Sequence, residues 1–217
     1  MNYNDILIKY IDEYPYDEPI FIEEIKDYFK GVINDNFDNV FKSIYVYINR
    51  LVHDNKIVQF IKGVYYKPLK GAFGNKLLNI NKVINKKYIL DNKGRKGYFS
   101  GAYLFNKIGL TTQIPANMLI VTNECSNAND YNNKNLGVVI RKPKIEINED
   151  NYKYLQLFDI LINKDNINIE VDNEKVIIYK FIKDNKLELE KIFEYANKIN
   201  NLKPIKRLYE LGGNNIE

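Results

Sequence analysis

The segment 38–54 constrains the fold most, because its apolar residues form a helical stripe that is followed at once by a β-prone hairpin. The stripe repeats about every 3.6 residues and consists of Val40, Phe41, Ile44, Ile48, Leu51 and Val52. It predicts one long amphipathic helix from about Asp38 to Asp54. The runs IVQFI and VYYK then flank Lys62-Gly63, which predicts a two-stranded hairpin.

Two shorter helices are expected before this one. Their apolar residues recur at helical spacing and are Ile6, Leu7, Tyr10 and Ile11 in the first, and Ile22, Ile25, Tyr28 and Phe29 in the second. Tyr14-Pro15 ends the first helix and Gly31 closes the second. Three helices and a hairpin form the order of a winged helix-turn-helix, so residues 1–70 are expected to be a DNA-binding domain whose third helix enters the major groove.

The outer face of the third helix carries side chains suited to this role. A projection at about 100° per residue places Asn39, Lys42, Ser43, Val46, Arg50 and His53 there. Asn39, Ser43 and Arg50 can hydrogen-bond base edges, and Lys42 can reach phosphate. The expected DNA-binding residues, including those of the hairpin, are Asn39, Lys42, Ser43, Val46, Arg50, Lys56, Lys62 and Lys67.

Charge is distributed unevenly along the chain. The net charge is −7 over residues 1–41, +12 over 42–110 and −1 over 111–217. A basic middle segment in a nearly balanced chain favours a polyanionic partner such as double-stranded DNA. A solvated lysine face, or a winged helix that contacts only proteins, is the alternative.

Residues 71–217 are expected to form a mixed α/β domain, which makes the whole chain α+β. A linker (69–76) leads to a helix ending near Ile84. A second helix is expected after Ser100, which caps it, and before Gly109. The remaining expected elements are strands at 118–122 and 137–142, a helix capped by Asn148, a hairpin of the β-prone runs 167–171 and 175–181, and two final helices from about 187 and 204.

No catalytic residue is assigned. The polar run Thr111, Thr112 and Gln113 follows a helix end and precedes Pro115, so it is expected to satisfy the last helix carbonyls and to stabilise an irregular turn. The basic turn DNKGRKG (91–97) lacks the GxxxxGK[ST] spacing and is interpreted as an exposed hairpin or loop. Glu170 and Asp172 resemble a metal-dependent nuclease motif only loosely, so an enzyme is the less favoured class.

No metal or cofactor site is expected. His53 is the only histidine, lacks partner ligands and is interpreted as a surface residue. Cys125 is the only cysteine, which excludes an intramolecular disulfide and fits a reducing compartment. The first residues carry acids among apolar side chains, and no run is long enough to span a membrane, so a cytoplasmic protein is expected.

Three stretches resemble the AbiEi-type antitoxin and transcriptional-regulator family of type IV toxin–antitoxin systems. They are RLVHDNKIVQFIKGVYYKP (50–68), SGAYLFNKIGLTTQIPANMLIVTN (100–123) and RKPKIEINEDNYKYLQLFDIL (141–161). The second is similar to the family's SGAYAxNxLGLTTQxP signature. The resemblance spans residues 20 to 210, while the first helix and the last helices match only in pattern.

The resemblance implies a two-domain antitoxin. Its winged helix would bind inverted repeats in its own promoter, and the domain 71–217 would help counter a nucleotidyltransferase-type toxin without necessarily touching it. It would thereby serve abortive infection, an antiviral defence. The alternatives are a protein-interaction module and a stand-alone phage or plasmid regulator.

Overall fold

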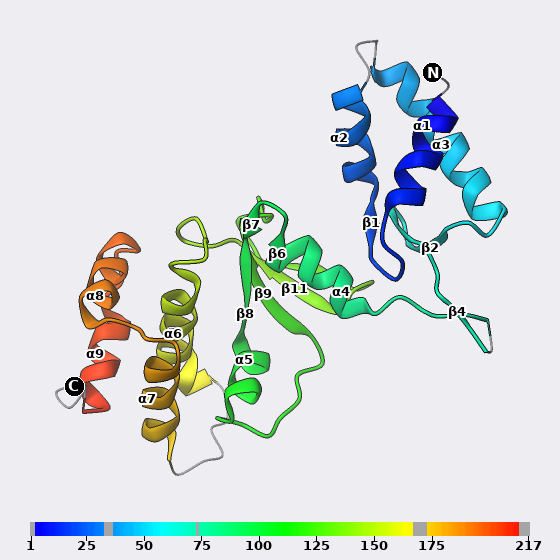
Figure 1. Ribbon diagram of the computed structural model, residues 1–217. Helices are drawn as coiled ribbons and strands as arrows, with labels where there is room; N and C mark the ends of the chain where they lie inside the picture. Colours follow the sequence, from blue (N-terminus) through cyan, green and yellow to red (C-terminus); the bar gives the residue numbers. More distant parts are fainter. Residues whose placement is uncertain (1–2, 33–36, 73, 167–172, 213–217) are drawn as a thin grey trace. The chain divides into compact units, whose positions relative to one another are not determined.

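A computed structural model describes residues 3–32, 37–72, 74–166 and 173–212. Within these ranges, only the backbone is described for residues 37–39, 41 and 166. The chain divides into two compact units, 1–86 and 87–217. Both contain helices and short strands, so the mixed α+β class expected from the sequence is confirmed (Figure 1).

Unit 1 begins with three helices and a small sheet. Its elements are α1 (Tyr3–Glu13), β1 (Ile20–Phe21), α2 (Ile22–Val32), α3 (Phe37–His53), β2 (Val58–Ile61) and β3 (Val64–Tyr66). The predicted hairpin is confirmed, since β2 pairs antiparallel with β3. The short strand β1 was not predicted. It pairs with β3 on the other side, and the sheet order is therefore β1-β3-β2.

The segment expected to be a linker is bound to the start of the chain. It contains two short antiparallel strands, β4 (Lys70–Gly71) and β5 (Gly74–Asn75), and the expected helix follows it as α4 (Ile80–Ile84). Lys76 and Lys82 donate to Asp17 Oδ2, both at 3.1 Å, and Lys86 lies 2.7 Å from Glu24 Oε1. These contacts tie residues 76–86 to the start of the chain, and the compact unit 1 extends to Lys86, whereas the DNA-binding domain is expected from the sequence to end at residue 70.

Unit 2 is built around a four-stranded sheet. A π-helical turn (Asn85–Ile89) leads into β6 (Leu90–Asp91), β7 (Gly94–Arg95), β8 (Gly97–Ser100), α5 (Gly101–Ile108), β9 (Met118–Thr122), β10 (Tyr131–Asn133) and β11 (Val138–Arg141). The sheet order is β10-β11-β9-β8, in which β11 and β9 run parallel and the other pairs antiparallel.

Helices cover this sheet and complete the core of unit 2. They are α6 (Tyr152–Asn163), a 3₁₀ turn (Lys164–Asn166), α7 (Glu174–Asp184), α8 (Leu189–Lys198) and α9 (Lys203–Glu210). The buried face of α6 contacts β8 and α9 and contributes Leu157, Phe158 and Leu161 to the core. In Figure 1, α6 and α7 stand beside the strands, and α8 and α9 lie beyond them.

One expected element is wrong. The run KVIIYKF (175–181) lies in α7 and is not a strand. Ile178, Phe181 and Ile182 are buried at helical spacing, so packing against the rest of unit 2 overrides the β preference of this branched run. Its expected partner, the run 167–171, lies outside the described residues.

Candidate nucleic-acid interface

The inner side of α3 anchors the helix in unit 1. Val40, Ile44, Ile48 and Leu51 are buried as expected and join residues of α1 and α2 in one core. Val52 is only half-buried, and the side chain of Phe41 is outside the described part. Because the buried stripe is fixed, the opposite side of α3 is fixed as well.

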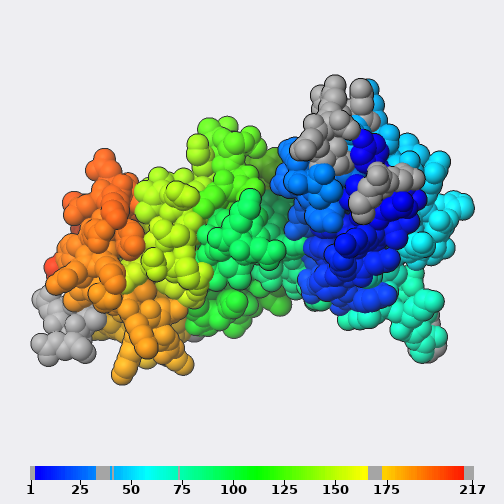
Figure 2. All heavy atoms as spheres, turned by 45° about the horizontal axis from the view of Figure 1, so that its top comes forward, coloured from blue at the N-terminus to red at the C-terminus, as the bar shows by residue number. Residues whose placement is uncertain are grey.

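That opposite side faces solvent. Lys42, Val46, Arg50 and His53 are exposed, and Ser43 is half-buried. Figure 2 shows atoms of α3, in light blue to cyan, at the surface of unit 1. The backbone of Asn39 lies in α3, but its side chain is among the undescribed ones.

Two further exposed side chains on α3 were missed from the sequence. Tyr45 and Asn49 are both exposed. Asn49 follows Lys42 by seven residues, which at about 100° per residue puts the two only ~20° apart on the helix. The same projection that selected Lys42 could therefore have selected Asn49. Arg50 stacks beside this face, with its guanidinium carbon 5.5 Å from the centre of the Tyr47 ring.

The hairpin presents two of its three expected lysines. Lys56 and Lys62 are exposed, and Gly63 follows in the left-handed conformation with φ of 80°, which the tight turn requires. The carbonyl of Gly63 accepts from the backbone N–H of Ile22 at 2.9 Å. The hairpin is thus tied to the start of α2.

The expected exposure of Lys67 is wrong. Lys67 is buried, and its ammonium donates to the carbonyls of Asp12 at 2.8 Å and Tyr14 at 2.9 Å. The same group lies 4.3 Å from the centre of the Tyr16 ring. The ammonium group of Lys67 therefore binds carbonyls at the end of α1. We remove Lys67 from the set of expected DNA contacts.

Charge in unit 1 is more balanced than its distribution along the sequence indicates. Residues 1–86 contain twelve basic and eleven acidic residues. Lysines 76, 82 and 86 are paired with acids near the start of the chain. Exposed acids lie on α1 and α2, namely Asp5, Asp12, Glu13, Glu23 and Asp27, whereas the described exposed side chains of α3 include no acid. The described exposed charges of α3 and the hairpin are thus basic, with Asp54 between the two elements, whereas α1 and α2 expose charges of both signs.

His53 and Cys125 are the side chains that the sequence raised for a metal site. His53 is exposed as expected, and its Nδ1 lies 3.3 Å from Asp54 Oδ1. Cys125 is buried and unbridged. No group of three or more metal-ligating side chains occurs among the described residues. Glu170 and Asp172, the loose nuclease motif, lie outside those residues.

In unit 2 the polar residues near α5 fulfil part of the role expected of them. Gly109 ends the helix with φ of 85°, and the last carbonyls accept from the backbone N–H groups of Gly109 and Leu110. Thr111 is buried, and its hydroxyl accepts from the N–H of Gln113 at 3.2 Å, so it stabilises the turn. Ser100 occupies the N-cap position of α5 as expected, but its side chain makes no capping hydrogen bond. Its hydroxyl donates instead to Asp159 at 2.6 Å.

The basic turn before β8 is a hairpin, as expected. Lys96 pairs with Asp91 at 2.8 Å. Arg95 pairs with Glu149 at 2.8 Å and lies 3.7 Å from the centre of the Tyr152 ring. Both cations already have partners within unit 2, so this turn is not arranged for phosphate.

Comparison with known proteins leaves the resemblance untested. No family model matches the chain, and no curated protein matches it. Within the described residues, no helix combines the length and apolar character needed to cross a lipid bilayer. The AbiEi-type resemblance therefore stays a prediction.

Proposed function

We propose that the protein is a transcriptional regulator whose unit 1 binds double-stranded DNA as a winged helix. The observation that carries the proposal is the order α1-β1-α2-α3-β2-β3 with the sheet order β1-β3-β2. In support of it, the exposed side chains described on α3 include no acid, and the hairpin that follows carries exposed lysines. A fold of this kind inserts its third helix into the major groove.

In this mode the side chains divide into two groups. Arg50 and Asn49 reach base edges, where guanidinium and amide groups read guanine and adenine. Lys42, Lys56 and Lys62 contact phosphates, which position the protein without specifying sequence. Val46, which is 50% exposed, gives an apolar contact suited to a thymine methyl group. Ser43 and Asn39 extend the base-reading set along the helix.

The resemblance to AbiEi-type proteins supports a narrower proposal. On that basis the protein is the antitoxin of a type IV toxin–antitoxin system, acts in the cytoplasm without catalysis and represses its own operon through inverted repeats. Its functional partner would be a nucleotidyltransferase-type toxin. A neighbouring gene with a nucleotidyltransferase signature would favour this role, and its absence would favour a stand-alone regulator.

The first test is binding to the DNA upstream of the gene, measured by titration at several salt concentrations. Arg50→Ala should weaken specific binding by about 1–3 kcal/mol and relax the preference at one base pair. Lys62→Ala should weaken binding to all DNA sequences alike. It should also reduce the slope of log affinity against log salt concentration by about one.

The control is Lys9→Ala, because Lys9 is an exposed cation on α1 that pairs with Glu13 at 3.9 Å. It should leave the titration unchanged. Equal losses for Lys9→Ala and Arg50→Ala would mean that only overall charge matters. Absence of any DNA shift, together with recovery of a partner protein, would replace the regulator with a protein-interaction module.

A further inference from the structure

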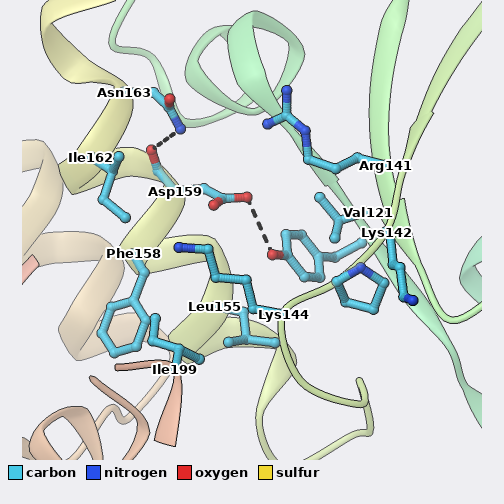
Figure 3. Close-up of a pocket in the computed structure, with 12 residues that line it drawn as sticks. Val121, Arg141, Lys142, Lys144, Leu155, Phe158, Asp159, Ile162, Asn163 and Ile199 are labelled. Atoms are coloured by element: carbon cyan, nitrogen blue, oxygen red, sulfur yellow. Dashed lines mark hydrogen bonds between the residues drawn. The ribbon is translucent and has the colours of Figure 1, made fainter. Parts of the chain in front are cut away.

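Unit 2 contains a pocket of about 200 Å³ at the edge of the sheet where the parallel strands β9 and β11 end. Tyr98 pairs in register with Val121, and Val121 with Arg141, so these side chains form one row across three strands. Residues of α6 form the opposite wall (Figure 3). Crevices outside the carboxyl ends of parallel strands are where open sheets bind ligands.

The polar centre of this pocket is Asp159 on α6. Its Oδ2 accepts from Ser100 Oγ at 2.6 Å and Tyr98 OH at 3.2 Å, whereas Oδ1 has no hydrogen-bond partner among the described residues. Burial raises the pKa of Asp159, although the two hydrogen bonds and the nearby cations act in the opposite direction. A carboxyl group kept in such surroundings is a candidate for binding rather than for stability.

A cation faces this carboxyl group across the pocket. Arg141 is already bound to Asp130 through two hydrogen bonds, of 2.9 and 2.7 Å. In Figure 3 the side chain of Lys144 reaches toward Asp159, while that of Lys142 points away. Lys144 forms no ion pair within the described part of the chain, and its charge acts on Asp159 by lowering the pKa of that carboxyl group. An acid group on a ligand would therefore share Lys144 with Asp159.

Most of the remaining wall is apolar and limits the size of the occupant. It includes Leu155, Phe158 and Ile162. Asn163 also lines the pocket, but its amide donates to the carbonyl of Asp159 at 2.8 Å. An apolar cavity of about 150 Å³ holds benzene, so this pocket has room for one ring and a few further atoms. A carboxylate on the ring would meet Lys144, and a hydroxyl group at the far end would donate to Oδ1 of Asp159.

We propose that this pocket binds a small ring-containing carboxylate that carries a hydroxyl group opposite its acid group. The proposal concerns unit 2 alone and does not require that unit 1 bind DNA. The probes are 4-hydroxybenzoate, benzoate, which lacks the hydroxyl group, and 4-hydroxybenzamide, which lacks the negative charge. Binding to the full-length protein is measured by calorimetry and by ligand-observed NMR.

4-Hydroxybenzoate should bind best, and loss of either group should weaken binding by about tenfold. Lys144→Gln should weaken 4-hydroxybenzoate and benzoate by about tenfold and leave 4-hydroxybenzamide unchanged. Asp159→Asn should weaken the two hydroxylated probes relative to benzoate, which makes no hydrogen bond to this side chain. The control is Lys134→Gln, since Lys134 is an exposed cation of unit 2 outside the pocket, and it should change none of the three.

The proposal is overturned if 4-hydroxybenzoate shows no saturable binding at about 1 mM. It is also overturned if Lys134→Gln weakens binding as much as Lys144→Gln, because the site would then lie elsewhere or be a diffuse charge effect. If Asp159→Asn does not fold, Lys144→Gln still decides, because Lys144 is exposed and contributes little to the core.

Discussion

Gly97 must be a glycine because there is no room for a side chain at this position. A Cβ atom there would lie 2.1 Å from the carbonyl oxygen of Tyr88 and 2.8 Å from that of Val121. Both obstacles are backbone, so they cannot rotate away. From sequence, this glycine was noticed only as the end of a basic turn. Its actual role is to let β8 approach its neighbours.

Gly97→Ala should therefore lower the free energy of unfolding of unit 2 by about 1–3 kcal/mol. Gly31→Ala is the matched control, because Gly31 lies in α2 and a Cβ there would have no atom within 4 Å. That substitution should stabilise unit 1 by about 0.5–1 kcal/mol through helix propensity. Denaturant titration of both variants measures the two changes in the free energy of unfolding, which should have opposite signs. A decrease for both variants would show that glycine is required for other reasons.

Asp159 carries a second residue-scale prediction, on pH. Its pKa is raised in the folded state by burial, so the folded protein holds a proton that the unfolded chain releases above about pH 3.9. The contribution of Asp159 to the free energy of unfolding is therefore complete below that pH, and it is lost as the pH rises through the pKa of the folded state. Asp159→Asn removes the titration while keeping an acceptor for Ser100 and Tyr98.

The variant should therefore unfold with about the same free energy as the wild type near pH 4 and be more stable by about 0.5–2 kcal/mol at neutral pH. Denaturant titrations at a series of pH values measure this difference, in which all other groups cancel. A difference that stays constant with pH would mean that the carboxyl group ionises normally.

At the scale of elements, strongly periodic segments were predictable and short or packing-dependent ones were not. The stripe of α3 and the glycine turn of the β2–β3 hairpin gave those elements correctly. The strand β1 has only two residues, Ile20 and Phe21, and exists through its pairing with β3. On α3 the exposed side chains followed the helix projection, although Asn49 was missed. Lys67, which follows β3, was placed wrongly because its burial depends on carbonyls more than fifty residues away.

The segment 175–181 gives a test of this distinction. Val176 is 62% exposed on α7, so Val176→Ala should stabilise unit 2 by about 0.5 kcal/mol, because alanine is the better helix former. In a strand the same change would destabilise. Ile178→Ala, which removes a fully buried side chain of the same helix, should cost about 2–5 kcal/mol and confirms that unfolding of this unit is being observed.

At the scale of the whole molecule, the cations of the basic middle segment fall into two groups in the folded chain. Part of the basic middle segment neutralises the acidic start, through Lys76, Lys82 and Lys86. The remaining exposed cations of unit 1 include those of α3 and the hairpin. Sequence counts could not separate these groups, because pairing depends on which acids the fold brings close. Because of these ion pairs, we expect the folding unit that contains α3 to extend to residue 86.

A fragment of residues 1–86 should therefore be more stable than one of residues 1–70. The reason is that Asp17 is buried, and hydrogen bonds from Lys76 and Lys82 hold its pKa below the usual range. Hydrogen bonds to charged groups contribute about 1.5–3 kcal/mol, which sets the expected difference in the free energy of unfolding.

Asp17→Asn in the longer fragment should remove most of that difference, since the carboxylate is the shared acceptor of both lysines. The stabilisation should also decline in acid, as pH falls through the folded pKa of Asp17. Denaturant titration of the three proteins at neutral and acid pH measures both effects. Equal stability of the two fragments would place the end of the folding unit at residue 70 and would leave these ion pairs as surface contacts without energetic weight.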